Sequence, residues 1–265
     1  MSLPSITPAT TSAQRAEARD RDHRPPLSRL TAVELRKMLN TRSGIWVTLG
    51  VGAVTVIFAL VNGLAHGGRD ATYTRVLHDA AQPSAYLLPL LGVLLICGEW
   101  TQRTTLTTFA LVPDRRRVLA AKAGAGLITS TAAWIVTLAV SAALTAAFSH
   151  APGGPGTLPA TVIAQSWLLL VSWMLVGLAF GMALLTTVPA IIAYLLLPIA
   201  CAGIASTIHS LSGATVWLDV ARSLAPLTLN PLSATQWAHL VTALAIWIGL
   251  PLVVGLWRIR RTDLA

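Results

Sequence analysis

Residues 162–185 read VIAQSWLLLVSWMLVGLAFGMALL, twenty-four positions without a charged side chain. About 20 consecutive apolar residues carry an α-helix across the ~30 Å hydrocarbon core of a bilayer, so this stretch predicts a transmembrane helix. Five further stretches qualify or come close, at 44–65, 83–102, 118–147, 190–208 and 239–257. The runs are continuous rather than alternating, which favours helices over β-barrel strands. The sequence therefore predicts an all-α integral membrane protein with six transmembrane helices.

The composition of the chain excludes ordinary soluble domains. Hydrophobic residues make up 54% of the 265 positions and charged residues 11%, less than half the charged share of about 25% in soluble domains. Too few polar groups remain to cover a surface that faces water. Cys97 and Cys201 lie inside the apolar runs, where neither a disulfide framework nor a metal site is expected.

The lysines and arginines predict the orientation of the spans. Sixteen of them fall on the side that holds both termini, and three, Arg69, Arg75 and Arg222, fall on the opposite side. Short loops rich in cations stay in the cytoplasm, so both termini are predicted to be cytoplasmic. The net charge of +9 is then a topological signal, and no binding of nucleic acid is expected.

The chain divides into four predicted parts. Residues 1–26 contain almost no large apolar side chain and are expected to form a disordered cytoplasmic tail. An interfacial helix is expected over 27–43, a domain of six transmembrane helices over 44–257 and a cytoplasmic tail over 258–265. The apolar run at 118–147 is too long to lie wholly in the hydrocarbon core.

The interfacial helix is basic and imperfectly amphipathic. A helical wheel places six residues in one arc: Leu27, Thr31, Ala32, Leu35, Met38 and Leu39. Arg29, Arg36 and Lys37 fall outside the arc, where they would face lipid headgroups, whereas Glu34 interrupts the pattern. A plain topogenic anchor remains the alternative reading of this segment.

The segment after the second span combines charge, threonine and proline. Glu99 and Arg103 are spaced i, i+4, so they can pair at the membrane boundary, where a lone carboxylate is costly. Pro113 ends the threonine-rich stretch, and the arginines after it mark the entry into the third span. We expect a short helix here, lying under the membrane and ended by the proline turn.

The residues at the predicted cytoplasmic ends of the first three spans follow a definite order. Glu34, Leu35, Arg36 and Lys37 precede the first span, and Glu99 and Trp100 lie at the base of the second. Next come the threonines, then Pro113, Arg116, Val118, Leu119 and Lys122. This order resembles the permease subunits of type 2 ABC transporters. The resemblance extends over most of residues 27–260, because the chain also has six predicted spans, two cytoplasmic ends and a long outer loop before the last span.

The resemblance implies a permease that dimerises, with an identical chain or a second permease chain, and docks onto a soluble ABC ATP-binding protein. That partner would hold ATP and Mg, since this chain has no Gly-x-x-x-x-Gly-Lys-Ser/Thr loop and needs no cofactor of its own. In the family, the short helix between spans 2 and 3 lies in a groove of the ATPase. The coupling residues here would be Glu99, Arg103, Thr104, Thr105, Phe109, Pro113, Asp114, Arg115, Arg116, Arg117 and Lys122. Alternatively, the arginines only fix topology.

The resemblance favours export and a bacterial plasma membrane, and the apolar composition favours an amphiphilic or lipid-like substrate. An ATPase-independent carrier or a scaffold is the alternative. An intramembrane enzyme is less favoured, because the spans hold no ionisable residue near their middle and no constellation of nucleophile and base. Small residues at four-residue spacing, Gly177 with Gly181 and Ala139 with Ala143, predict close helix packing within the chain or across a dimer.

Overall fold

The computed structural model describes residues 25–65, 72–101, 115–148, 156–207 and 215–261. Within these ranges all regular structure is helical. Five stretches are long and apolar enough to cross a membrane: Gly44–Leu64, Tyr73–Gly98, Arg116–Phe148, Ala160–Leu184 and Ala234–Arg258. The prediction of an all-helical chain is confirmed over these residues, and the five stretches suggest a multi-pass membrane protein.

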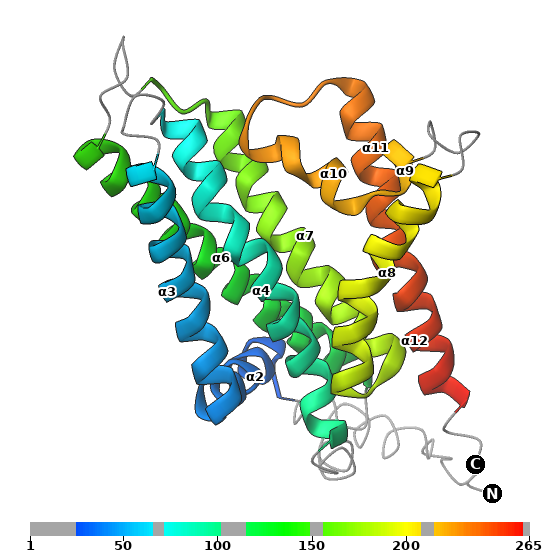
Figure 1. Cartoon of the computed structure of the whole chain (residues 1–265). Coiled ribbons are helices and arrows are strands. Elements are labelled where there is room, and N and C mark those ends of the chain that lie inside the picture. Colours follow the sequence, from blue (N-terminus) through cyan, green and yellow to red (C-terminus); the bar gives the residue numbers. More distant parts are fainter. Residues whose placement is uncertain (1–24, 66–71, 102–114, 149–155, 208–214, 262–265) are drawn as a thin grey trace, which may run out of the picture.

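The long helices run side by side in one bundle, with α2 at one end and α9 and α10 at the opposite end (Figure 1). The first half of the chain forms α2 (Leu27–Asn40), α3 (Arg42–Ala65), α4 (Tyr73–Thr101) and α6 (Arg115–Phe148). The second half begins with α7 (Ala160–Leu184) and α8 (Thr187–Thr207), followed by the short α9 (Thr215–Leu218), α10 (Val220–Leu224) and 3-10 turn η2 (Ala225–Thr228). It ends with α11 (Ala234–Leu244), the π-helical turn η3 (Ala245–Gly249) and α12 (Leu250–Arg261), which follow without a break.

Two helices depart in length from a simple span. The fifth predicted span corresponds to α8, whose apolar stretch Thr187–Cys201 is shorter than the other five. In contrast, α6 has 34 residues and is about 50 Å long, well beyond the hydrocarbon thickness. Its excess length lies partly at the end where α2 packs against it.

Helix α7 is the centre of the bundle. Residues 169–174 are all buried, and six consecutive residues point in every direction around a helix. A helix that is apolar on all sides is expected to lie inside a larger protein. The other strongly buried span is α4, which packs directly against α7.

The contact between α4 and α7 is close enough to require glycine. A Cβ atom on Gly177 would overlap the carbonyl oxygen of Pro89, and one on Gly92 would lie 2.8 Å from the backbone of α7. Gly181 lies beside Val93 in the same interface. The predicted glycine stripe thus packs against α4 within the chain, as small residues do between membrane helices. By contrast, Ala139 and Ala143 lie on an exposed face of α6.

The outer faces of α3, α8 and α12 are strongly apolar. Large exposed side chains on these helices include Trp46, Leu49, Ile57, Val61, Leu64, Leu196, Ile199, Val253, Val254 and Trp257. Exposed apolar surface of this extent is rare on soluble monomers. Hydrocarbon chains of a bilayer are the environment that suits it.

The end of the bundle opposite α2 is covered by α9, α10 and η2. Val220, Leu224 and Leu227 of this cover are fully buried. The indole Nε1 of Trp247 donates a hydrogen bond of 2.7 Å to the carbonyl of Leu218. The segment between α8 and α11 is therefore packed onto the bundle through both apolar and polar contacts.

Candidate functional site at the junction of α2, α4 and α6

The corner between α2 and α3 fixes the direction in which α2 leaves the bundle. Thr41, the residue between the two helices, donates from Oγ1 to the carbonyl of Met38 (3.2 Å) and accepts from the backbone N–H of Gly44 (3.1 Å). A Cβ on Gly44 would overlap the Met38 carbonyl oxygen. One threonine side chain thus caps both helices, and a glycine permits the tight approach.

The face of α2 that packs on the bundle is centred on Glu34. Glu34 and Met38 are buried, with Thr31 and Leu35 partly buried beside them. Arg29 and Arg36 are exposed, in agreement with the predicted wheel. Leu27 and Ala32, which the wheel places in the same arc as Leu35 and Met38, are also exposed. The packed face is turned toward Glu34 because α6 provides a partner for its carboxylate.

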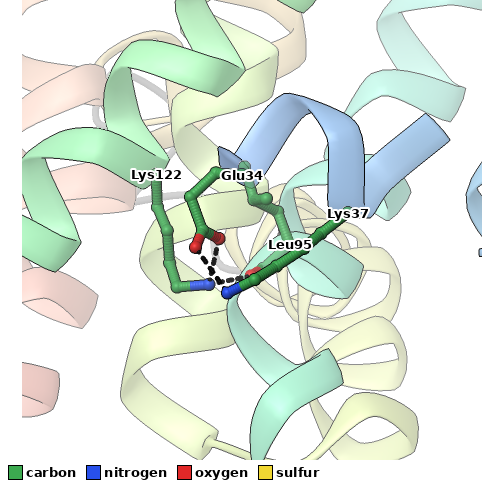
Figure 2. A network of polar contacts seen from close by, with 4 residues as sticks. All are labelled: Glu34, Lys37, Leu95 and Lys122. Carbon is green, nitrogen blue, oxygen red and sulfur yellow. Dashed lines mark hydrogen bonds and ion pairs between the residues drawn. The ribbon is translucent and has the colours of Figure 1, made fainter. Parts of the chain in front are cut away.

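That partner is Lys122. Its Nζ donates to Glu34 Oε2 at 2.6 Å and to the backbone carbonyl of Leu95 at 3.0 Å. Lys37 donates to the other carboxylate oxygen of Glu34 at 2.8 Å. Figure 2 shows the two ammonium groups converging on one carboxylate, with the Leu95 carbonyl beside them. One buried lysine therefore joins α6 to both α2 and α4.

The electrostatics of this network are those of a buried ion pair. The side chains of Lys122 and Glu34 are 5% and 6% exposed, whereas that of Lys37 is 43% exposed. Charges taken out of water must be paired and hydrogen-bonded, and removing one partner typically costs about 3–5 kcal/mol. The Glu34–Lys122 pair is thus the strong element of the network, and Lys37 is an accessory.

A second contact holds the start of α2. The Nη2 group of Arg117 donates to the carbonyl of Pro25 at 2.8 Å, and Pro25 lies two residues before the first helical residue, Leu27. Arg117 and Lys122 are separated by about 7 Å along α6. Helix α6 therefore holds α2 at two points. Two residues predicted as coupling residues make contacts within the chain.

The junction lies beside the segment predicted to couple to a partner. Leu95 is less than two turns before the end of α4 at Thr101, and Lys122 is about two turns after the start of α6 at Arg115. The network therefore ties together the two helices that flank residues 102–114.

The structure places only part of the predicted coupling set. Arg116 is exposed on the first turns of α6. The backbones of Glu99 and Arg115 belong to α4 and α6, while their side chains lie outside the described part. Six predicted residues fall wholly outside the described residues: Arg103, Thr104, Thr105, Phe109, Pro113 and Asp114.

The pairing of Glu34 with Lys122 was missed by the reading of the sequence. The sequence predicts separate roles for them, Glu34 in the interfacial helix and Lys122 among the coupling residues. A signal was available, because a lysine inside the apolar run 118–147 needs an anionic partner. Glu34 stands on the neighbouring predicted helix and is one such carboxylate.

Comparison of the chain with models of known protein families finds no match. A comparison with curated proteins also finds none. In the described ranges, no three His, Cys, Asp or Glu side chains gather where a metal ion could bind. The junction fastens three helices to one another at one end of the apolar bundle, through a buried ion pair and a hydrogen bond.

Proposed function

We propose that this chain is the transmembrane permease subunit of an ATP-driven ABC transporter of type 2. In this proposal α8 completes a set of six spans, both termini are cytoplasmic and the chain dimerises in the plasma membrane of a bacterium. The transporter exports an amphiphilic or lipid-like substrate. A soluble ATP-binding protein, with its ATP and Mg, docks at the end of the bundle that carries α2.

The observation that carries the proposal is the three-helix junction. Energy supplied by a partner can move a membrane bundle only if the contacted segment transmits force to the spans. Lys122 joins α6 to α2 through Glu34 and to α4 through Leu95. A displacement of residues 102–114 would therefore be passed to both flanking helices and to α2 together.

The distribution of charge supports the same end as the docking side. Arg29, Arg36 and Arg116 are exposed at the end that carries α2, whereas Arg75 and Arg222 are exposed at the opposite end. Cations concentrate on the cytoplasmic side of multi-pass proteins. That is the side on which a soluble ATPase meets its permease.

The proposal is tested by purifying the tagged full chain from native membranes in mild detergent and identifying bound proteins by mass spectrometry, with an ATPase assay on the eluate. We expect a stoichiometric soluble ATP-binding protein. Charge reversal in Arg116→Glu should lower its yield, because Arg116 is exposed beside the predicted docking segment. The matched control is Arg222→Glu, which reverses an exposed arginine at the far end of the bundle and should leave the yield unchanged.

A chain that is repeatedly purified alone, well folded and without ATPase activity would contradict the proposal. The ATPase-independent carrier or scaffold would then replace it. Equal loss of the partner in Arg116→Glu and Arg222→Glu would contradict docking at the α2 end.

A further inference from the structure

A cavity of about 330 Å³ lies between α2, α3, α4 and α6. Its floor is fully buried and includes Leu88 and Leu91 of α4. On its α6 side it is lined by Ile128, Ala132 and Val136, which recur every four residues and are exposed. Residues at this spacing share one face of a helix. The cavity therefore opens laterally along α6, to the surroundings of the spans rather than to either end of the bundle.

The lining of this lateral cavity suits a hydrocarbon chain. Among the described residues that line it, none carries a charge, and the polar side chains are hydroxyls. Two of these, Thr55 Oγ1 and Ser84 Oγ, bond to each other at 3.0 Å and are buried. Gly52 also lines the cavity, and a Cβ built on it meets no atom within 4 Å. The volume lies in the range of small-molecule sites, which are mostly apolar.

One end of the lateral cavity carries an unsatisfied polar group. Thr48 lines the cavity, and its Oγ1 is buried without a hydrogen-bond partner in the described structure. Buried hydroxyls are normally hydrogen-bonded, so such an atom calls for an acceptor or donor from outside the chain. Thr48 lies less than two turns into α3, at the end where Leu35 and Met38 of α2 also line the cavity.

The same end is flanked by cations. Arg36 and Lys37 are both exposed on α2 and lie between the lining residues Leu35 and Met38 in the sequence, and Lys37 also bonds to Glu34. An amphipathic helix with basic residues attracts anionic headgroups at a membrane surface. Toward α2, the apolar slot is thus followed by an unsatisfied hydroxyl and then by a basic helix. The acyl chain, ester and headgroup of a phospholipid follow one another in the same order.

We propose that the lateral cavity binds one acyl chain of an anionic membrane phospholipid. The Thr48 hydroxyl donates to an ester oxygen of the lipid, and the phosphate faces the cations of α2. The site is independent of the proposed transport function, since it requires only that the spans lie in a bilayer. It is a lipid-binding site between helices of one chain.

Photolabelling tests the site. The full chain is reconstituted into nanodiscs of phosphatidylcholine containing a small fraction of phosphatidylglycerol with a diazirine in one acyl chain, and adducts are mapped by mass spectrometry. Gly52→Leu fills the lateral cavity. Gly50→Leu is its matched control, because Gly50 lies on the same helix, also has open space around its Cβ and does not line the cavity. Adducts at exposed Val253 of α12 report general lipid contact.

We expect adducts on the lining residues of α3 and α6 to saturate with the lipid probe and to fall about tenfold in Gly52→Leu, while Gly50→Leu and the α12 adducts stay unchanged. Adducts that rise linearly at both places, or that survive in Gly52→Leu, would overturn the site. The same diazirine chain on phosphatidylcholine should label the cavity several-fold less at low salt. Equal labelling by the two lipids would overturn the anionic headgroup.

A second pair of variants guards against misfolding of Gly52→Leu. Ala132→Phe closes the mouth of the cavity from α6, and Ala139→Phe adds the same bulk at another exposed position of α6 that does not line it. Loss of the cavity adducts in Ala132→Phe alone is expected. Equal adducts in both phenylalanine variants would refute the proposal.

Discussion

Replacing Glu34 by glutamine should lower the free energy of unfolding by about 3–5 kcal/mol. The substitution keeps the shape of the side chain and removes its charge. Lys122 then stays buried, with its ammonium 3.0 Å from the Leu95 carbonyl and without the carboxylate that lies at 2.6 Å. The cost arises chiefly from this uncompensated charge rather than from the lost hydrogen bond.

The magnitude follows from distance and burial. Two unit charges 2.6 Å apart attract by about 6 kcal/mol at an effective dielectric constant near 20, and part of this is offset by the desolvation of both groups. Lys37 also contacts Glu34, but its side chain is 43% exposed, so its contribution should stay below about 1 kcal/mol. Lys37→Met is therefore the matched control for Lys122→Met.

The assay is reversible unfolding of the full chain in mixed micelles by increasing dodecyl sulfate, followed by tryptophan fluorescence, since the chain has nine tryptophans. Glu34→Gln, Lys122→Met and the double variant form a thermodynamic cycle. We expect each single variant to lose about 3–5 kcal/mol and the double variant to lose much less than the sum, because the two charges disappear together.

Two results would refute this reasoning. One is a loss of less than about 1 kcal/mol in both single variants, which is the range of exposed ion pairs. The other is strict additivity in the double variant, which would mean that Glu34 and Lys122 do not interact.

Two further substitutions test the packing of the bundle. Gly177→Ala places a Cβ where the Pro89 carbonyl lies, so the variant should lose about 1–3 kcal/mol of unfolding free energy in the same assay. Gly63→Ala is the control, because Gly63 has open space around it, and it should be neutral or gain up to about 1 kcal/mol. Equal stability of the two variants would contradict the close contact. Trp247→Phe removes the 2.7 Å hydrogen bond to Leu218, at a cost of about 1 kcal/mol. Hydrogen exchange at residues 215–218 should then become about fivefold faster. An unchanged exchange rate would show that this bond does not hold α9 on the bundle.

The helical class of the fold follows from local properties of the sequence. Runs without charge, such as residues 162–185, have few structural solutions in an apolar environment, because every backbone polar group must be bonded within the segment. Length alone also indicated that the run at 118–147 exceeds the hydrocarbon core. Helix α6 does so, with 34 residues.

The three-helix junction depends on contacts that no local pattern contains. Glu34 and Lys122 are separated by 88 positions. Taken alone, each is only a charged residue in a segment whose pattern calls for an apolar one. The rotation of α2 about its axis follows from that pairing, so that Glu34 lies in the packed face although it interrupts the amphipathic pattern. The lateral cavity likewise depends on how four helices pack together, and no local sequence pattern distinguishes the residues that line it.

The contact between α4 and α7 has a consequence for motion within the chain. With Gly177 seated over the backbone of Pro89, neither helix can slide by one residue along the other without driving a side chain into a main chain. The two helices must therefore move together as one rigid body. Displacements relative to this pair are therefore left to helices such as α3, α6 and α8, whose outer faces carry apolar side chains that slide along lipid rather than along backbone.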